Sequence, residues 1–133
     1  IYFSDEAAEN LRTYLLSGGF LHADDNYGLD PYFREAIKKV FPNRPLKKIS
    51  NQHPLYSIKF EFKEGLPKIH EHDGLPAEAY GIEDDNGRLM VVFTYESDLG
   101  NGWEDASVHG DPENIRLEAL QMGTNLLIYA FHR

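Results

Sequence analysis

Apolar positions in the first part of the chain follow a helical spacing and then change to a short apolar run. Ser4 precedes two acidic residues, and apolar or small side chains recur at positions 7, 8, 11, 14 and 15. This pattern predicts a helix with Ser4 as its N-cap and Gly18 as its C-terminal stop. The run 20–23 is short and apolar, although His22 interrupts it, and it predicts a strand buried on both faces.

A second helical spacing follows this predicted strand. Asp30 and Pro31 suit an N-cap and a first helical turn, and apolar side chains at positions 33, 36, 37, 40 and 41 form one stripe. Pro42 then ends the helix. A helix, a strand and another helix in this order favour a layered α/β sandwich.

Strand patterns and a turn signal occupy the middle of the chain. Residues 57–62 alternate apolar and charged side chains, which predicts a half-buried strand, and residues 46–49 are a candidate edge strand. Residues 77–83 and 88–95 flank the sequence Asp84-Asp85-Asn86-Gly87. Asn-Gly between two strand-like runs predicts an antiparallel hairpin, and we expect its second strand to be central in the sheet.

The chain closes on a long helical pattern. Asp111 and Pro112 suit a helix start, and an apolar face then continues to Phe131, which predicts a helix over residues 113–131. Gly123 in mid-helix costs about 1 kcal/mol relative to Ala. We therefore expect a close contact between this helix and the sheet at Gly123.

Length and composition favour one α/β domain over residues 1–133. Apolar residues make up 41% of the chain and charged residues 26%, which is typical of a folded protein. The net charge of -9 argues against a nucleic-acid or anionic membrane partner, and no apolar run is long enough to span a membrane. The chain has no cysteine, which excludes disulfides, thiolate nucleophiles and zinc–thiolate sites. Oligomeric state stays open.

Two groups of polar residues each follow an apolar strand. The first group is Asp24, Asp25, Asn26 and Tyr27. The second group contains Asp98, Trp103, Glu104 and Asp105. If the two strands are parallel neighbours, their carboxyl ends bring both groups to one edge, where open α/β sheets bind ligands. The other interpretation is that these acids cap helices and lie solvated in loops.

A third group of polar residues has the spacing of metal ligands. His70 and His72 are separated by one residue, so on an extended strand both imidazoles point to one face, and Asp73 is a candidate third ligand. The alternative is a pair of surface histidines hydrogen-bonded to neighbouring acids.

Three other rings have two interpretations each. His22 is either a hydrogen-bonded core residue or a group that orients Asp24. His53 either bonds to the backbone or aims its ring from the extended conformation that Pro54 imposes. Trp103, the only tryptophan, either anchors its loop on the sheet or stacks on a sugar ring or a cation.

The order of several motifs resembles one family over essentially the whole chain. The longest motif is Gly18-Gly19-Phe20-Leu21-His22-Ala23-Asp24-Asp25-Asn26-Tyr27-Gly28. The others are Leu11-Arg12-x-Tyr14-Leu15, Gln52-His53-Pro54-Leu55-Tyr56, Lys68-Ile69-His70-Glu71-His72-Asp73-Gly74, Asp98-Leu99-Gly100-x-Gly102-Trp103-Glu104-Asp105, Leu120-x-Met122-Gly123-x-Asn125 and Tyr129-Ala130-Phe131. This combination resembles an uncharacterised bacterial family catalogued as domain of unknown function four-one-five-nine.

The resemblance implies a relation to the class I glutamine amidotransferase-like fold, a flavodoxin-like α/β sandwich. It also implies that an N-terminal βα portion with one or more strands lies outside this chain, and that the protein belongs to the bacterial periplasm or cell envelope. Amidotransferases need a cysteine on a strand-to-helix elbow. This chain has none, so we expect no glutaminase activity.

We therefore expect a three-layer α/β sandwich with a mostly parallel sheet and an antiparallel hairpin at or near its edge. The leading hypothesis is a domain that binds a polar small molecule, sugar-like or cationic, at the carboxyl ends of the strands. One alternative is a metal-dependent hydrolase in which histidines and acids hold a divalent ion. The other is a non-catalytic interaction module.

Overall fold

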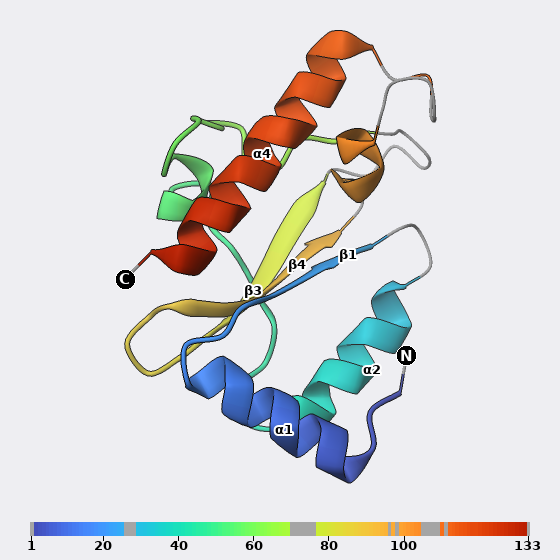
Figure 1. Ribbon diagram of the computed structural model, residues 1–133, viewed down its shortest axis with the longest axis vertical. Helices are drawn as coiled ribbons and strands as arrows, with labels where there is room; N and C mark the ends of the chain where they lie inside the picture. The colour runs from blue at the N-terminus through green and yellow to red at the C-terminus, as the bar shows by residue number, and fades with distance from the viewer. Residues whose placement is uncertain are drawn as a thin grey trace.

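The chain forms a mixed α/β fold (Figure 1). The computed structural model describes residues 2–25, 29–69, 77–95, 97, 99–104, 110 and 112–132. In chain order the helices and strands are α1 (Asp5–Leu16), β1 (Leu21–Asp24), α2 (Asp30–Val40), β2 (Lys47–Lys48), β3 (Glu78–Glu83), β4 (Leu89–Tyr95) and α4 (Glu113–Phe131). Two short 3-10 helices are η1 (Pro54–Tyr56) and η2 (Leu99–Trp103).

The strands form one sheet in the order β1-β4-β3-β2. β1 lies parallel to β4, with Asp24 beside Thr94, whereas β4 with β3 and β3 with β2 are antiparallel pairs. The prediction of a mostly parallel sheet is therefore wrong. The reason is that the β3–β4 hairpin occupies the middle of the described sheet and β2 extends it in an antiparallel direction.

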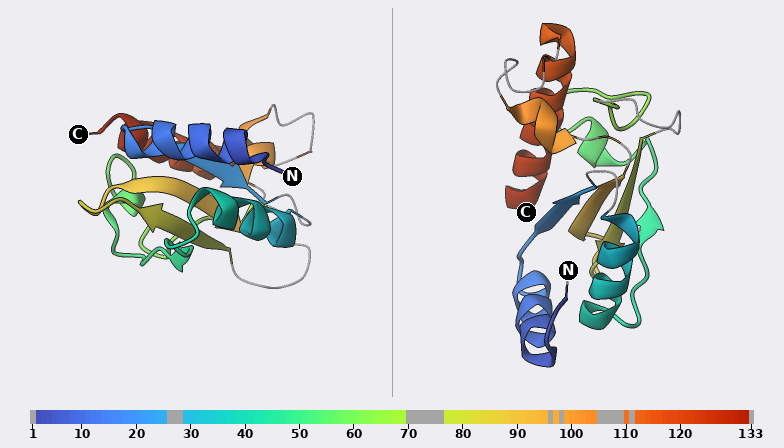
Figure 2. Two further views of the ribbon diagram at one scale, coloured as in Figure 1. Left: turned by 90° about the horizontal axis from the view of Figure 1, so that it is seen from below. Right: turned by 90° about the vertical axis from the view of Figure 1, so that its right-hand side faces the viewer.

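Helices cover both faces of the sheet. On one face, α1 and α2 pack against β3 and β4 around Ile37, Val91 and Phe93. On the other face, α4, η1 and η2 pack around Val92 and Met122. In Figure 1 and in the right-hand view of Figure 2, α4 lies in the upper half and the pair α1 and α2 in the lower half, with the strands between them. β4 is one of the two inner strands, which agrees with its predicted central place, and its side chains contribute to both cores.

Local signals locate the helices correctly. The Ser4 hydroxyl accepts from the Ala7 amide at 3.1 Å and caps α1, which ends at Leu16 just before Gly18 with its φ of 113°. The last helix has the predicted bounds. No helix in the described ranges has the length and apolarity that crossing a bilayer requires.

Two strand predictions differ from the structure. Residues 57–62 form no strand, because Asn125 on α4 takes both backbone groups of Phe60: the Phe60 amide donates to Oδ1 at 2.9 Å, and Nδ2 donates to the Phe60 carbonyl at 2.8 Å. β1 was expected to be buried on both faces. Each of its four residues is instead partly exposed, since β1 lies at the edge of the described sheet.

The hairpin forms where Asn-Gly predicts it, with a three-residue loop between Asp84 and Arg88. The Gly87 amide donates to the Asp84 carbonyl at 3.1 Å, and the Asp84 amide donates to the Arg88 carbonyl at 2.9 Å. Arg88 then reaches the end of α1, where its guanidinium donates to the carbonyls of Leu15 and Gly19, both at 2.8 Å. This side chain therefore joins the hairpin to the turn that leads into β1.

Candidate functional site

Residues from three segments meet at the edge of the sheet where β1 and β4 end. The carboxylate of Asp24, the last residue of β1, accepts from the Thr94 hydroxyl at 2.6 Å and from the Gly100 amide at 2.7 Å. Thr94 lies near the end of β4, and Gly100 lies in η2. We call this meeting point, formed by Asp24, Asp25, Thr94 and Gly100, the rim. Of the two predicted polar groups, the rim brings together Asp24 of the first and the 99–103 stretch of the second.

Asp25 stabilises the start of α2 at the rim. Its side chain is only 1% exposed, and its Oδ1 accepts from the Leu29 amide at 2.9 Å. Its backbone amide donates to the Thr94 carbonyl at 2.8 Å. Asp30, which we expected to be the cap, lies inside the first turn of α2 and pairs with Arg34 at 2.6 Å. The helix-capping interpretation therefore applies to Asp25, and the predicted Asp30 cap is wrong.

His22 is linked to Asp24 through the hydroxyl of Thr94. The Thr94 hydroxyl donates its one hydrogen to Asp24, so its oxygen accepts from His22 Nε2 at 2.9 Å. Burial lowers the pKa of His22 to about 4, which leaves the ring neutral near pH 7. His22 is therefore a hydrogen-bonded and largely buried residue, and it also contributes to the orientation of Asp24 through the Thr94 hydroxyl that lies between them.

Trp103 anchors η2 on α4 and also presents part of its ring to solvent. Its indole Nε1 donates to the Ala119 carbonyl at 2.6 Å, and the residue is 36% exposed. A Cβ at Gly123 would lie 2.9 Å from the indole Nε1. Gly123 thus permits the close contact that we predicted, but the partner is the indole of Trp103 rather than a strand.

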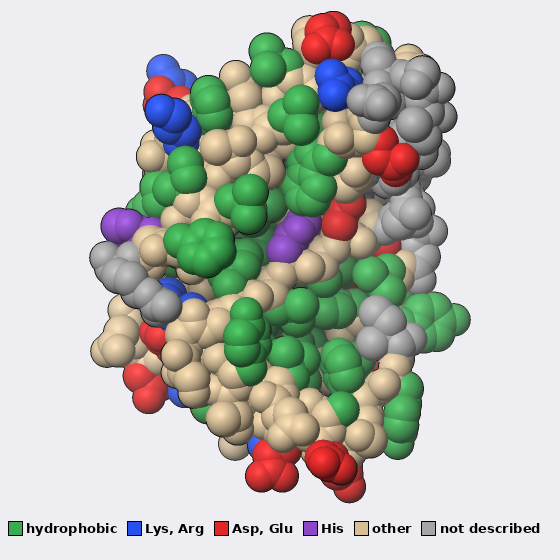
Figure 3. Space-filling view, in the orientation of Figure 1, with side chains coloured by type: hydrophobic (Ala, Val, Ile, Leu, Met, Phe, Trp, Pro, Cys, Tyr) green, Lys and Arg blue, Asp and Glu red, His purple; other side chains and the backbone are tan. Residues whose placement is uncertain are grey.

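An apolar hollow of about 380 Å³ lies beside Trp103, between α4 and β1. It is lined by Phe20, His22, Trp103, Leu120, Gly123, Thr124, Leu126, Leu127 and Ala130. Figure 3 shows the face of the molecule on which a histidine side chain lies in a depression bordered by hydrophobic side chains. The ring centroids of His22 and Trp103 lie 5.7 Å apart. The hollow therefore offers an aromatic wall and few polar groups, which suits a ligand that has an apolar face.

Several predicted site residues fall outside the described part of the chain. They are Asn26, Tyr27, Asp98 and Asp105 at the two polar groups, and His70, His72 and Asp73 of the candidate metal site. Glu104 is exposed, and its backbone carbonyl accepts from Arg116 at 3.0 Å. Within the described ranges, no three histidine or acidic side chains are grouped in a way that would hold a metal ion.

Thr94 and Gly100 were not among the predicted site residues. A threonine at the end of an otherwise apolar strand and a glycine two residues after Asp98 were the available signals. Neither signal identifies a partner, because Asp24 lies 70 residues before Thr94 and 76 residues before Gly100. His53 bonds to the backbone, as one of its two interpretations predicts, since its Nδ1 accepts from the backbone amide of Leu55 at 3.0 Å.

The fold and the rim define a mixed α/β domain whose polar side chains gather at the end of two parallel strands. The family model described as Domain of unknown function (DUF4159) matches residues 1–131, and the chain belongs to this family. No curated protein and no solved structure matches the chain.

Proposed function

We propose that this domain binds a small molecule at the rim and in the adjoining hollow. The observation that carries the proposal is the hydrogen bond from the Gly100 amide to the Asp24 carboxylate at 2.7 Å. This bond joins the last residue of β1 to η2, which follows β4 in the chain, and it brings η2, with Trp103, beside β1. Such a position outside the carboxyl ends of parallel strands is where α/β sheets usually bind ligands.

The ligand class follows from the lining of the hollow and from the acids at the rim. An apolar lining with one indole face requires a ligand with an apolar face, and nearby carboxylates favour hydroxyl or ammonium groups. A sugar ring, with its C–H face and its hydroxyl edge, has both properties, and so does an organic cation. We therefore propose a sugar-like or cationic ligand.

The family resemblance supports three further parts of the proposal. We propose that the domain is a divergent relative of the flavodoxin-like, class I glutamine amidotransferase-like fold, that it forms one domain, and that it acts in the bacterial periplasm or cell envelope. We also propose that it lacks glutaminase activity, because the chain has no cysteine to serve as the nucleophile. The metal-dependent hydrolase and the interaction module stay as alternatives, and the former depends on His70, His72 and Asp73.

The intrinsic fluorescence of Trp103 tests the proposal directly, because the chain has one tryptophan. Titration with glucose, N-acetylglucosamine and choline is expected to give a saturable change in emission with at least one of them. Leu127→Asn, which removes an aliphatic side chain from the hollow, is expected to weaken that binding by about tenfold.

Ile128→Asn is the matched control. Ile128 is the next residue on α4, is also exposed, and does not line the hollow. It is expected to bind the same probe with unchanged affinity. No saturable response to any of the three probes, or an equal loss of affinity in the two variants, would count against the proposed site.

A further inference from the structure

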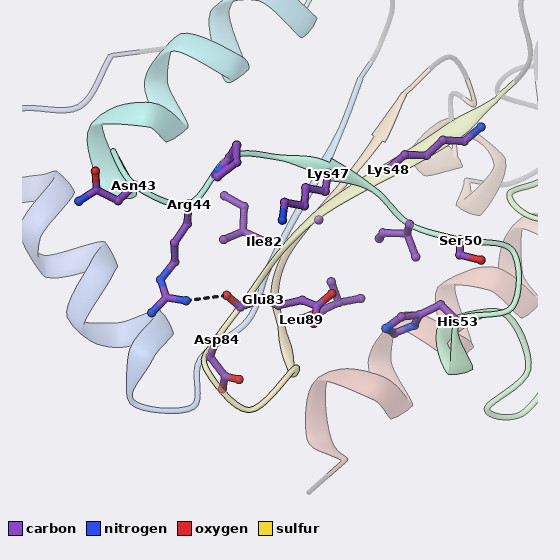
Figure 4. A pocket seen from close by; sticks show the side chains of 13 residues that line it. Asn43, Arg44, Lys47, Lys48, Ser50, His53, Ile82, Glu83, Asp84 and Leu89 are labelled. Carbon is purple, nitrogen blue, oxygen red and sulfur yellow. Dashed lines mark hydrogen bonds between the residues drawn. The ribbon is translucent and has the colours of Figure 1, made fainter.

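A second cleft, of about 510 Å³, lies along β2 and β3 and shares no residue with the hollow (Figure 4). One wall is the connection 43–53, which contains β2. The floor is the end of β3 with the first residue of β4, and every residue that lines the cleft is described. No part of the proposed function uses this cleft.

The connection is held to the sheet near its middle and near its start. Near the middle, Lys47 pairs with Gly81 and Lys48 with Tyr80, and the Ile49 amide donates to the Ala79 carbonyl at 2.8 Å. Near the start, the Arg44 guanidinium donates to the Glu83 carbonyl at 3.0 Å, the bond drawn as a dashed line in Figure 4. Pro45, between these two points, also lines the cleft.

The floor of the cleft is apolar. Gly81 has no side chain there, and a Cβ built on it would lie 2.5 Å from Leu89 and 3.1 Å from Ile49. Leu89 and Ile49 are both nearly fully buried. A ligand in the cleft would therefore meet aliphatic side chains below and polar groups at the sides.

Two side chains of opposite charge, Lys47 and Glu83, line the cleft and form no ion pair with each other. Lys47 and Glu83 are not paired with any charged residue of the described chain, whereas neighbouring charges are paired: Lys48 lies 3.7 Å from Glu78, and Asp84 lies 3.3 Å from Arg88. In Figure 4 the side chain of Lys47 points into the cleft and that of Lys48 points away from it. Lys47 and Glu83 therefore offer one cationic and one anionic group to the same space.

His53 adds a neutral hydrogen-bond donor. Its Nδ1 accepts from the Leu55 amide at 3.0 Å, so the hydrogen of the neutral ring lies on Nε2. Burial lowers the pKa of His53, although the nearby Glu83 opposes this effect, and the ring is therefore neutral near pH 7. Figure 4 shows the ring directed into the cleft from the end opposite Arg44.

We propose that this cleft binds a free amino acid with an apolar side chain. The ligand carboxylate would accept from the Lys47 ammonium and from Nε2 of His53, and the ligand ammonium would pair with Glu83. The aliphatic side chain would lie on Leu89 and Ile49. A zwitterion is the ligand class that satisfies both charges at once, since a simple anion or cation would leave one of them without a counterpart.

Leucine is the probe that tests this proposal, with leucinamide and N-acetylleucine as analogues that each lack one charge. In an amide-resolved NMR titration, leucine is expected to shift the resonances of residues that line the cleft and to leave the Trp103 indole unchanged. Each analogue is expected to bind at least tenfold more weakly. Because Trp103 lines the hollow and not the cleft, an unchanged Trp103 signal would show that leucine binds in the cleft and not at the site of the proposed function.

Two variants and one control complete the test. Lys47→Gln and Glu83→Gln are each expected to weaken leucine binding by about tenfold, and Lys48→Gln is expected to leave it unchanged. Three results would overturn the proposal: no shift of the cleft resonances with leucine at millimolar concentration, equal binding of leucine and N-acetylleucine, or the same loss with Lys48→Gln as with Lys47→Gln.

Discussion

Acidification is expected to weaken the folded protein by about 3 kcal/mol through His22 alone. Burial lowers the pKa of this ring from 6.5 to about 4. Below pH 6.5 the unfolded chain therefore takes up a proton that the folded chain does not take up until about pH 4. The folded protein therefore has its full free energy of unfolding above pH 6.5, and about 3 kcal/mol of that free energy is lost as the pH falls to about 4.

The measurement is urea unfolding at about pH 7 and about pH 4.5 for the wild type and for His22→Gln. Glutamine retains an amide donor for Thr94 but does not titrate, so the variant is expected to lose about 2 to 3 kcal/mol less than the wild type over this interval. His132→Gln, at the exposed end of α4, is the control and should behave as the wild type does. An equal loss in the wild type and His22→Gln would show that His22 is not held neutral by burial.

The replacement Asn125→Leu is expected to lower the free energy of unfolding by about 3 kcal/mol. Asn125 is fully buried, and its amide satisfies both the N–H and the C=O of Phe60. Leucine has a similar volume, so the variant tests the two hydrogen bonds rather than the packing. The two backbone groups of Phe60 would be left without protein partners in a partly buried position, and each such loss costs about 1 to 3 kcal/mol.

Denaturant unfolding at neutral pH measures this cost. Gln121→Leu is the matched control, because it makes the same change from an amide to leucine on the same helix at a side chain that is less buried. We expect the control to change stability by no more than about 0.5 kcal/mol. If Asn125→Leu were as stable as Gln121→Leu, the segment 57–62 would not depend on Asn125 for its position.

The helices could be predicted from the sequence because their signals are local. Ser4 lies three residues before the amide that it caps, and the apolar stripes of α2 and α4 repeat every three or four residues. Residues 57–62 show the limit of such signals. Their alternation is typical of a strand, but the partner of Phe60 is a side chain 65 residues later, and no local pattern identifies it.

Part of the candidate site could also be predicted. The expectation that the two polar groups share one edge required only that β1 and β4 be parallel neighbours, and the bond between Gly100 and Asp24 brings one part of each group together. The roles of individual side chains depended on contacts across the sheet. Thr94 connects His22 to Asp24 only because β1 and β4 are in register at that position, and the Asp25 carboxylate accepts from the amide of Leu29, the residue before α2.

One NMR titration tests the central claim, that the rim and the hollow form a ligand site, most directly. The Trp103 indole N–H gives a single cross-peak, and the Gly100 amide reports on the bond to Asp24. With N-acetylglucosamine or choline, both signals are expected to shift along one saturating curve while the Gly87 amide, in the hairpin turn, stays constant. Signals of Trp103 and Gly100 that stay fixed with both compounds, or that move no more than the signal of Gly87, would contradict a binding site at the rim.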